Sequence, residues 1–190
     1  NLEIAPALAN KWEVNKEGTV YTFHLQPDAV FHDGKPVTAS DVVYSWERAA
    51  NPATASDTVI TYLGDIIGVK EMRAGKAESI SGLKIIDDYT LQVTIDAAKP
   101  YFLYKLTYPT ANILDRENVE ADPEWFRSPN GTGPYQLETW ISMERKVYTR
   151  FEEYYGNKPA IPVILFRLYS GDEFRLYEAG AVDIANVYAY

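Results

Sequence analysis

The sequence predicts an α/β protein of the mixed α+β kind, with strands and helices in both halves of its 190 residues. Three patterns lead to this prediction. Several segments alternate apolar and polar residues, which is the period of a half-buried strand. Others place apolar residues every three to four positions, which is the period of an amphipathic helix. Clusters of Gly, Asn, Asp and Pro separate these segments, as turn formers do.

The first elements form a predicted hairpin. Trp12 and Val14 alternate with polar residues, Gly18 follows in a turn, and residues 20–25 alternate again. Two alternating segments joined by a glycine turn are typical of a β-hairpin. A further turn is expected at Asp33-Gly34, because both residue types favour turns.

A helix is predicted next, over residues 39–50. Thr38 precedes Asp41 by three positions, a spacing close to that of a capping box, although the box usually ends in Glu or Gln. Apolar residues then recur on one face, and Asn51-Pro52 ends the helix. We expect Thr38 to cap this helix and Trp46 to be buried against the first hairpin.

The middle of the chain contains short elements. Residues 66–74 are predicted to be helical, with Gly75 as a left-handed cap. Residues 83–86 and 91–95 alternate on either side of Asp87-Asp88 and predict a second hairpin. Pro100 suits the first turn of a short helix that ends near residue 106. The residue pattern changes from Tyr108-Pro109 onward. We therefore expect a boundary between two sub-structures near residues 108–115.

The second half is predicted to be β followed by α. Residues 130–134 form a turn, and residues 135–140 and 145–151 form a third hairpin. The apolar run at 163–169 is typical of a buried strand. A helix is expected over 172–179 with Gly180 as its cap, and a strand over 181–184, which together predict one βαβ unit.

Composition excludes several classes of protein. The chain has 18 basic and 27 acidic side chains, a net charge of −9, which argues against nucleic acids and anionic membranes as partners, because both bind a clustered basic face. It has no cysteine, which removes disulfides, thiolate nucleophiles and cysteine-based metal sites. No apolar run approaches the length of a membrane span.

Candidate catalytic and metal-binding residues are few, and each has an ordinary structural interpretation. His24 and His32 have no third ligand at a spacing that suits zinc. Asp87-Asp88 suits a turn, and Glu152-Glu153 suits a solvated surface. Residues 130–133 lack the Lys-Ser/Thr of a phosphate-binding loop, and no nucleophile elbow is present. We therefore predict no catalytic residue, no metal and no cofactor.

The aromatic residues have two alternative roles. Aromatic residues make up 14% of the chain, with 15 tyrosines among them. Such residues serve a packed core or a ligand-binding cleft, and composition does not distinguish these.

The sequence begins at Asn1 without a signal segment and ends at Tyr190 within an apolar run, so we expect a piece of a longer polypeptide.

Several strings carry a family resemblance, and they occur in one order along nearly the whole chain: residues 7–14 and 21–25, 31–46, 86–91, 100–102, 131–135 with Trp140, and 174–184. In this order they resemble the family 5 extracellular solute-binding proteins, the ligand-capturing subunits of bacterial peptide and nickel ABC importers. The longest of them, residues 31–46, begins with Phe31-His32-Asp33-Gly34 and ends with Tyr44-Ser45-Trp46. Residues 43–48, Asn51-Pro52 and residues 74–76 are most similar to the oligopeptide binders.

The resemblance implies a fold and a division of the chain. The fold would be part of a periplasmic-binding-protein-like type II fold with a small extra α/β domain. Residues 1–113 would form the small extra domain of the first lobe, and residues 114–190 part of the ligand-binding lobe. The second lobe would be absent from this chain.

The resemblance also implies a function without enzymatic activity. The protein would capture peptides outside the cytoplasm, in the periplasm or as a cell-surface lipoprotein, and deliver them to ABC permease subunits. In the intact protein it would be a monomer. The residues that would contact the ligand are Asn186, Val187, Tyr188 and Tyr190, which follow the last predicted strand. The alternatives are a family member that binds a nickel complex or an oligosaccharide, an extracytoplasmic hydrolase, and a structural interaction domain.

Overall fold

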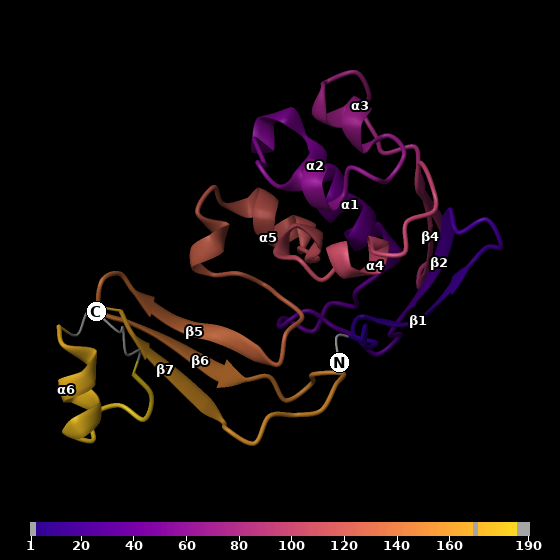
Figure 1. Cartoon of the computed structure of the whole chain (residues 1–190). Helices are drawn as coiled ribbons and strands as arrows, with labels where there is room; N and C mark the ends of the chain where they lie inside the picture. Colours follow the sequence, from indigo (N-terminus) through magenta and orange to yellow (C-terminus); the bar gives the residue numbers. More distant parts are fainter. Residues whose placement is uncertain (1–2, 169–170, 186–190) are drawn as a thin grey trace.

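The computed structural model describes residues 3–168 and 171–185, and within them the strands form two antiparallel sheets (Figure 1). The four strands of the first sheet all precede residue 95, and the three strands of the second all follow residue 134. Helices α1 to α5 lie on one side of the first sheet. The mixed α+β class is therefore confirmed, whereas the domain boundary expected between residues 113 and 114 stays a prediction.

The first sheet has the order β1-β2-β4-β3. Its strands are β1 (Ala9–Val14), β2 (Val20–Leu25), β3 (Leu83–Asp87) and β4 (Thr90–Thr94). Both predicted hairpins are confirmed, β1 with β2 and β3 with β4. The central pair is β2 with β4, in which Phe23 lies opposite Leu91.

Helix α1 (Ala39–Ala50) lies where the sequence predicts it. At its start, the backbone N–H and the hydroxyl of Thr38 both donate to the Asp41 carboxylate, each at 2.8 Å. The hydroxyl of Thr38 is therefore held by the acid, and the acid closes the first turn of the helix. Trp46 is buried, and its indole Nε1–H donates to the carbonyl oxygen of Ala111 at 3.1 Å.

The main core lies between α1 and the first sheet. The inward side chains of β2 and β4 alternate with outward ones, as the period of a half-buried strand requires. This core contains Tyr21, Phe23, Leu25, Val42, Trp46, Leu91, Val93, Ile95 and Phe102. A smaller cluster of Ala29, Phe31 and Val37 forms within the loop between β2 and α1.

Short helices connect the main elements: η1 (Pro52–Thr54), α2 (Val59–Tyr62), α3 (Val69–Arg73), α4 (Phe102–Lys105), η2 (Pro109–Ala111), α5 (Arg116–Ala121) and η3 (Trp125–Arg127). The helix expected at 66–74 is shorter than predicted. Ile66 forms an isolated bridge with Ile95. Gly68 has a φ of 95°, a left-handed conformation that a helix cannot contain, so α3 begins only after it.

The second sheet has the order β5-β6-β7, with β5 (Tyr135–Ile141), β6 (Arg145–Arg150) and β7 (Val163–Arg167). The third predicted hairpin, β5 with β6, is confirmed. The prediction that 163–169 is a buried strand is wrong for its described part. Val163, Leu165, Phe166 and Leu168 are 43–53% exposed, because β7 is the edge of a three-stranded sheet and no described element covers it.

Helix α6 (Glu173–Glu178) follows β7, and Figure 1 shows it beside one end of the second sheet. The Asp172 carboxylate caps it by accepting the N–H groups of Phe174 and Arg175. The strand expected at 181–184 is absent from the described chain, and with it the predicted βαβ unit. No described strand pairs with this segment, and Ile184 is 88% exposed. Within residues 3–168 and 171–185, no helix has the length and apolar character needed to cross a membrane.

Candidate functional site

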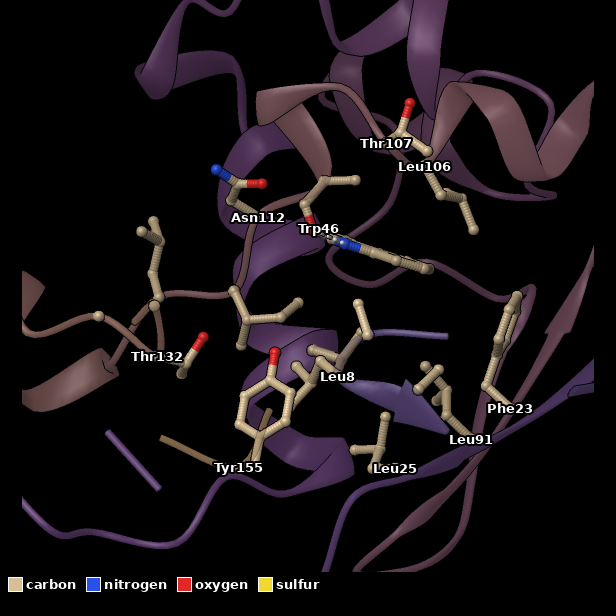
Figure 2. A pocket seen from close by; sticks show the side chains of 18 of the residues that line it. Leu8, Phe23, Leu25, Trp46, Leu91, Leu106, Thr107, Asn112, Thr132 and Tyr155 are labelled. Carbon is tan, nitrogen blue, oxygen red and sulfur yellow. Dashed lines mark hydrogen bonds between the residues drawn. The ribbon is translucent and has the colours of Figure 1, made fainter. Parts of the chain in front are cut away.

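A groove of about 700 Å³ lies between the first sheet, α1 and the turn at 129–133 (Figure 2). Its volume lies within the range of small-molecule sites in proteins. Apolar side chains make up most of its wall, and Figure 2 shows Trp46 and Leu106 opposite Leu25 and Leu91. Trp46, Leu25 and Leu91 are at most 5% exposed, so the groove lies directly against the main core.

The polar groups of the groove are neutral side chains. Thr107, Asn112 and Thr132 contribute hydroxyl and amide groups, and Tyr155 extends into the groove from the segment between β6 and β7. Burial, together with the neighbouring Tyr154, raises the pKa of Tyr155 to about 12. This phenol therefore stays protonated and can donate a hydrogen bond. No Asp, Glu, Lys or Arg occurs among the described residues that line the groove. The groove therefore suits uncharged, largely apolar groups.

The turn that closes the groove is held by a histidine from the first half of the chain. The His32 backbone N–H donates to the Gly131 carbonyl at 2.9 Å. The imidazole contacts the same turn, with Nδ1 accepting the Gly131 N–H at 3.3 Å and Nε2 lying 3.0 Å from the Gly133 carbonyl oxygen. Next to it, the Asp33 N–H donates to the Asn130 side chain at 3.2 Å.

A buried carboxylate joins the same parts of the chain from the other side. Asp115 is 3% exposed and accepts hydrogen bonds from the ammonium of Lys35 and the amide of Asn130, each at 3.0 Å. It also caps α5 by accepting the N–H groups of Glu117 and Asn118. Burial by itself would raise the pKa of Asp115, but the hydrogen bonds from Asn130 and Lys35 outweigh it and hold that pKa below its usual value.

Two of the carboxylates considered for catalysis, Asp87 and Glu152, have structural contacts. Within residues 3–168 and 171–185, no group of three or more His, Asp or Glu side chains could hold a metal ion. Asp87 accepts the N–H of Tyr89 at 2.9 Å, which confirms its predicted place in a turn. Glu152 forms an exposed ion pair with Arg150 at 2.8 Å. The candidate ligand contacts Asn186, Val187, Tyr188 and Tyr190 lie outside the described residues.

Sequence reasoning missed both the groove and the contact that closes it. By its local pattern, His32 is an ordinary turn histidine, and the Gly-rich turn at 130–133 is a weak phosphate motif. They are about 100 residues apart, and no local pattern pairs residues over such a separation. No local sequence pattern indicates that Tyr155 lines the groove, because its position depends on how the segment after β6 packs against the first half of the chain.

Comparison with known proteins places this architecture. Residues 3–190 match the bacterial extracellular solute-binding proteins, family 5. The chain belongs to this family. The oligopeptide-binding protein OppA of Escherichia coli is 37% identical over 191 residues, which cover 96% of this chain and 35% of that protein. The probable deoxycholate-binding periplasmic protein YgiS of the same organism is 34% identical over 149 residues, which cover 75% of this chain and 28% of that protein.

Solved structures of the family have the same fold. OppA of Listeria monocytogenes bound to peptide superposes with a TM-score of 0.86 at 31% identity, over 94% of this chain and 37% of that chain. These 190 residues thus span about a third of the length of the relatives they match. The mixed α+β structure is that of part of a periplasmic binding protein of type II, as the resemblance implied.

Proposed function

We propose that this family 5 chain belongs to the substrate-binding component of an ABC importer, which captures peptides and delivers them to the membrane permease. The observation that carries the proposal is the match to family 5 along residues 3–190, together with relatives named as oligopeptide- and dipeptide-binding proteins. A solved relative of the same fold holds a peptide. The neutral, largely apolar groove agrees with a protein that binds organic solutes.

The contact with peptide is assigned to the segment that follows α6. Asn186 would hydrogen-bond the peptide backbone, and Tyr188 would offer a ring face or a hydroxyl, with Val187 and Tyr190 beside them. Tyrosine suits such a site because it combines a large apolar face with a polar tip. The rest of the binding cleft would come from parts of the full-length protein that these 190 residues do not include.

The remaining properties follow from the same role. The protein would work outside the cytoplasm, either in the periplasm or as a surface lipoprotein, as a monomer that docks on the permease subunits. It would return its ligand chemically unchanged, without enzymatic activity or a cofactor. Its net charge of −9 disfavours nucleic acid as a partner.

A second candidate is an amphipathic steroid-like solute. The relative named as a probable deoxycholate-binding protein is nearly as similar as the peptide binders, and the groove has an apolar wall with a few neutral polar groups. Such a lining suits a bile acid's ring system. A nickel complex or an oligosaccharide, the other ligands considered from the sequence, has no comparable support in the groove.

Calorimetry on the full-length protein tests the proposal. Short peptides of varied sequence are titrated first, and then deoxycholate. The bound ligand is recovered, and its mass is measured by mass spectrometry. We expect peptides to bind, deoxycholate to give no heat, and the peptides to be recovered intact. Binding of deoxycholate alone would favour the second candidate, and hydrolysed peptides would replace the binding role with an enzymatic one.

A further inference from the structure

The groove has two chemically different ends. Figure 2 shows mainly apolar side chains at one end, among them Phe23 and Leu91. The other end carries the neutral polar groups of Asn112, Thr132 and Tyr155. Asn112 is exposed, whereas Leu91 is 1% exposed. The polar end is therefore the mouth of the groove, and the apolar end is its inner wall.

The polar groups near the inner wall are already used within the chain. The hydroxyl of Thr107 donates to the carbonyl oxygen of Tyr104 at 2.8 Å. The indole N–H of Trp46 donates to the carbonyl oxygen of Ala111 at 3.1 Å. A ligand at this end therefore meets apolar surface, and neither of these two donors is left for it.

The polar groups at the mouth are arranged differently. The side chains of Asn112 and Thr132 form no hydrogen bond with another residue in the part of the chain that the structure describes. The phenol of Tyr155 keeps its proton, because burial raises its pKa to about 12. A second tyrosine of the groove, Tyr135, already donates its hydroxyl to the carbonyl oxygen of Ile161 at 2.8 Å. The mouth thus offers neutral donors and acceptors to a ligand.

The charges around the mouth determine which head group fits. No charged side chain is among the described residues that line the groove. A second hollow of about 400 Å³ adjoins the groove at residues 129–130 and is lined by Asp33, Asp115 and Glu117. Lys35, beside these acids, pairs with Asp115 at 3.0 Å and with Glu117 at 3.2 Å. An anionic head group at the mouth would therefore lie near acids whose neighbouring cation is already paired.

We propose that the groove is a binding site for an uncharged amphiphile, with a ring or alkyl body against the inner wall and a hydroxyl or amide head group at Thr132 and Tyr155. Its volume of about 700 Å³ suits a ligand of drug size. Burial of the apolar body drives binding, and a neutral head group leaves no charge without a partner. A bile acid has a suitable ring body but carries a carboxylate, for which the groove offers no cation. This site does not depend on the peptide-binding function proposed above.

Two probes with the same ring system test the head group. They are 1-pyrenemethanol, which is neutral, and 1-pyrenecarboxylate, which is an anion at neutral pH. Each is titrated into the full-length protein and followed by energy transfer from tryptophan to pyrene, since Trp46 lies in the groove wall. We expect the alcohol to bind about 10-fold more tightly than the carboxylate, because the groove has no group that compensates a buried charge. Equal affinities, or binding of neither probe, would overturn the proposal.

Variants at the mouth locate the head group. Tyr155→Phe and Thr132→Val nearly keep the side-chain shape but remove a hydroxyl, and each should weaken binding of the alcohol by about 2- to 10-fold. Tyr135→Phe is the matched control, because the hydroxyl of Tyr135 bonds to Ile161 and not to the ligand. Affinities of Tyr155→Phe and Thr132→Val equal to that of the control would overturn the assigned position.

A change of preference provides a test that loss of folding cannot mimic. Thr132→Lys places a cation at the mouth and should strengthen binding of 1-pyrenecarboxylate by about 2- to 5-fold, the effect of a partly exposed ion pair. Thr132→Glu should not strengthen it. A carboxylate affinity that is the same in Thr132→Lys, Thr132→Glu and the parent would contradict a head group at Thr132.

The 190-residue chain identifies any other occupant of the groove. If this chain binds 1-pyrenemethanol and the full-length protein does not, another part of the polypeptide fills the groove and the proposal is wrong. If the probe dissociates a dimer in light scattering, the occupant is a second copy of the chain, which also overturns it. A full-length protein that binds the alcohol but no peptide would remove the proposed function and keep this site.

Discussion

The carboxylate of Asp65 and the ammonium of Lys105 lie 2.6 Å apart, although 40 residues separate them in the sequence. Lys99 donates to the other oxygen of the same carboxylate at 2.7 Å. Asp65 is 7% exposed and lies between α2 and α3, whereas both lysines flank or belong to α4. A single buried acid therefore fastens α4 to the helices that follow α1.

This arrangement predicts a stability that is lost in acid. Burial by itself would raise the pKa of Asp65, but the hydrogen bonds and charges of Lys105 and Lys99 outweigh it and lower that pKa. The stabilisation is therefore complete above the unfolded-state pKa of about 3.9, and is lost as pH falls through the lower folded-state value. Asp65→Asn should cost about 1.5–3 kcal/mol at neutral pH.

Urea unfolding of the parent and of Asp65→Asn at neutral and at acidic pH checks this prediction. The difference between the two proteins should shrink in acid, because the parent carboxylate is then protonated and loses its charge. Asp57→Asn is a control, since Asp57 is exposed. A difference of the same size at both pH values would contradict the assigned role of the ion pairs.

Trp46 should contribute more to stability than any other tryptophan among the described residues. Its ring is 5% exposed in the main core. Trp46→Ala should cost about 3–5 kcal/mol through the cavity it leaves. Trp46→Phe keeps an aromatic ring but leaves the Ala111 carbonyl without its donor, and should lower the free energy of unfolding by about 1–3 kcal/mol. Chemical unfolding measures both, with the half-buried Trp125→Phe as the comparison, and equal effects at the two sites would refute the prediction.

The start of α1 gives a smaller and graded effect. Thr38→Ala removes the hydroxyl bond to Asp41 but keeps the backbone bond, and should cost about 1 kcal/mol, as loss of an N-cap side chain usually does. Asp41→Ala removes both bonds and should cost more. Thermal unfolding of the two variants and of Asp41→Asn, which keeps an acceptor oxygen, orders them. The same melting temperature for all would mean that the acid does not close this turn.

The sequence predicts elements whose signals are local, and it fails where distant segments decide. The three hairpins and α1 follow from alternation, turn residues and a capping spacing that lie within a few residues of each other. The burial of β7 depends instead on what covers the second sheet, and its apolar run alone cannot reveal an exposed edge. The groove and the contact between His32 and Gly131 need residues 99 positions apart to meet, so only the folded chain reveals them.

The exposed edge of β7 should make the 190-residue chain associate. Leu165 is 52% exposed on a strand whose outer side pairs with no described strand. Uncovered apolar edges of this kind pair with other chains. Light scattering should show an apparent mass that rises with concentration, and Leu165→Lys should reduce this rise. Arg167→Lys on the same strand keeps its charge and should behave as the parent. A monomeric parent at all concentrations would show that the edge is not available.

Asn186 and Tyr188 test where the ligand meets this chain. Both follow α6, and we propose that they give the peptide a hydrogen bond and an aromatic contact. Asn186→Ala and Tyr188→Ala in the full-length protein should each weaken peptide binding by about 1–3 kcal/mol in calorimetry, if a partner group on the peptide is left unpaired or uncovered. Tyr188→Phe separates the two roles of the tyrosine, because it keeps the ring and removes the hydroxyl. The exposed Tyr177→Phe on α6 is the control. The 190-residue chain alone should bind peptide far more weakly than the full-length protein, since one part of a cleft buries little of a ligand and does not offset the cost of ordering it. Unchanged affinities in all three variants of Asn186 and Tyr188, for a peptide that the parent binds tightly, would remove both residues from the site.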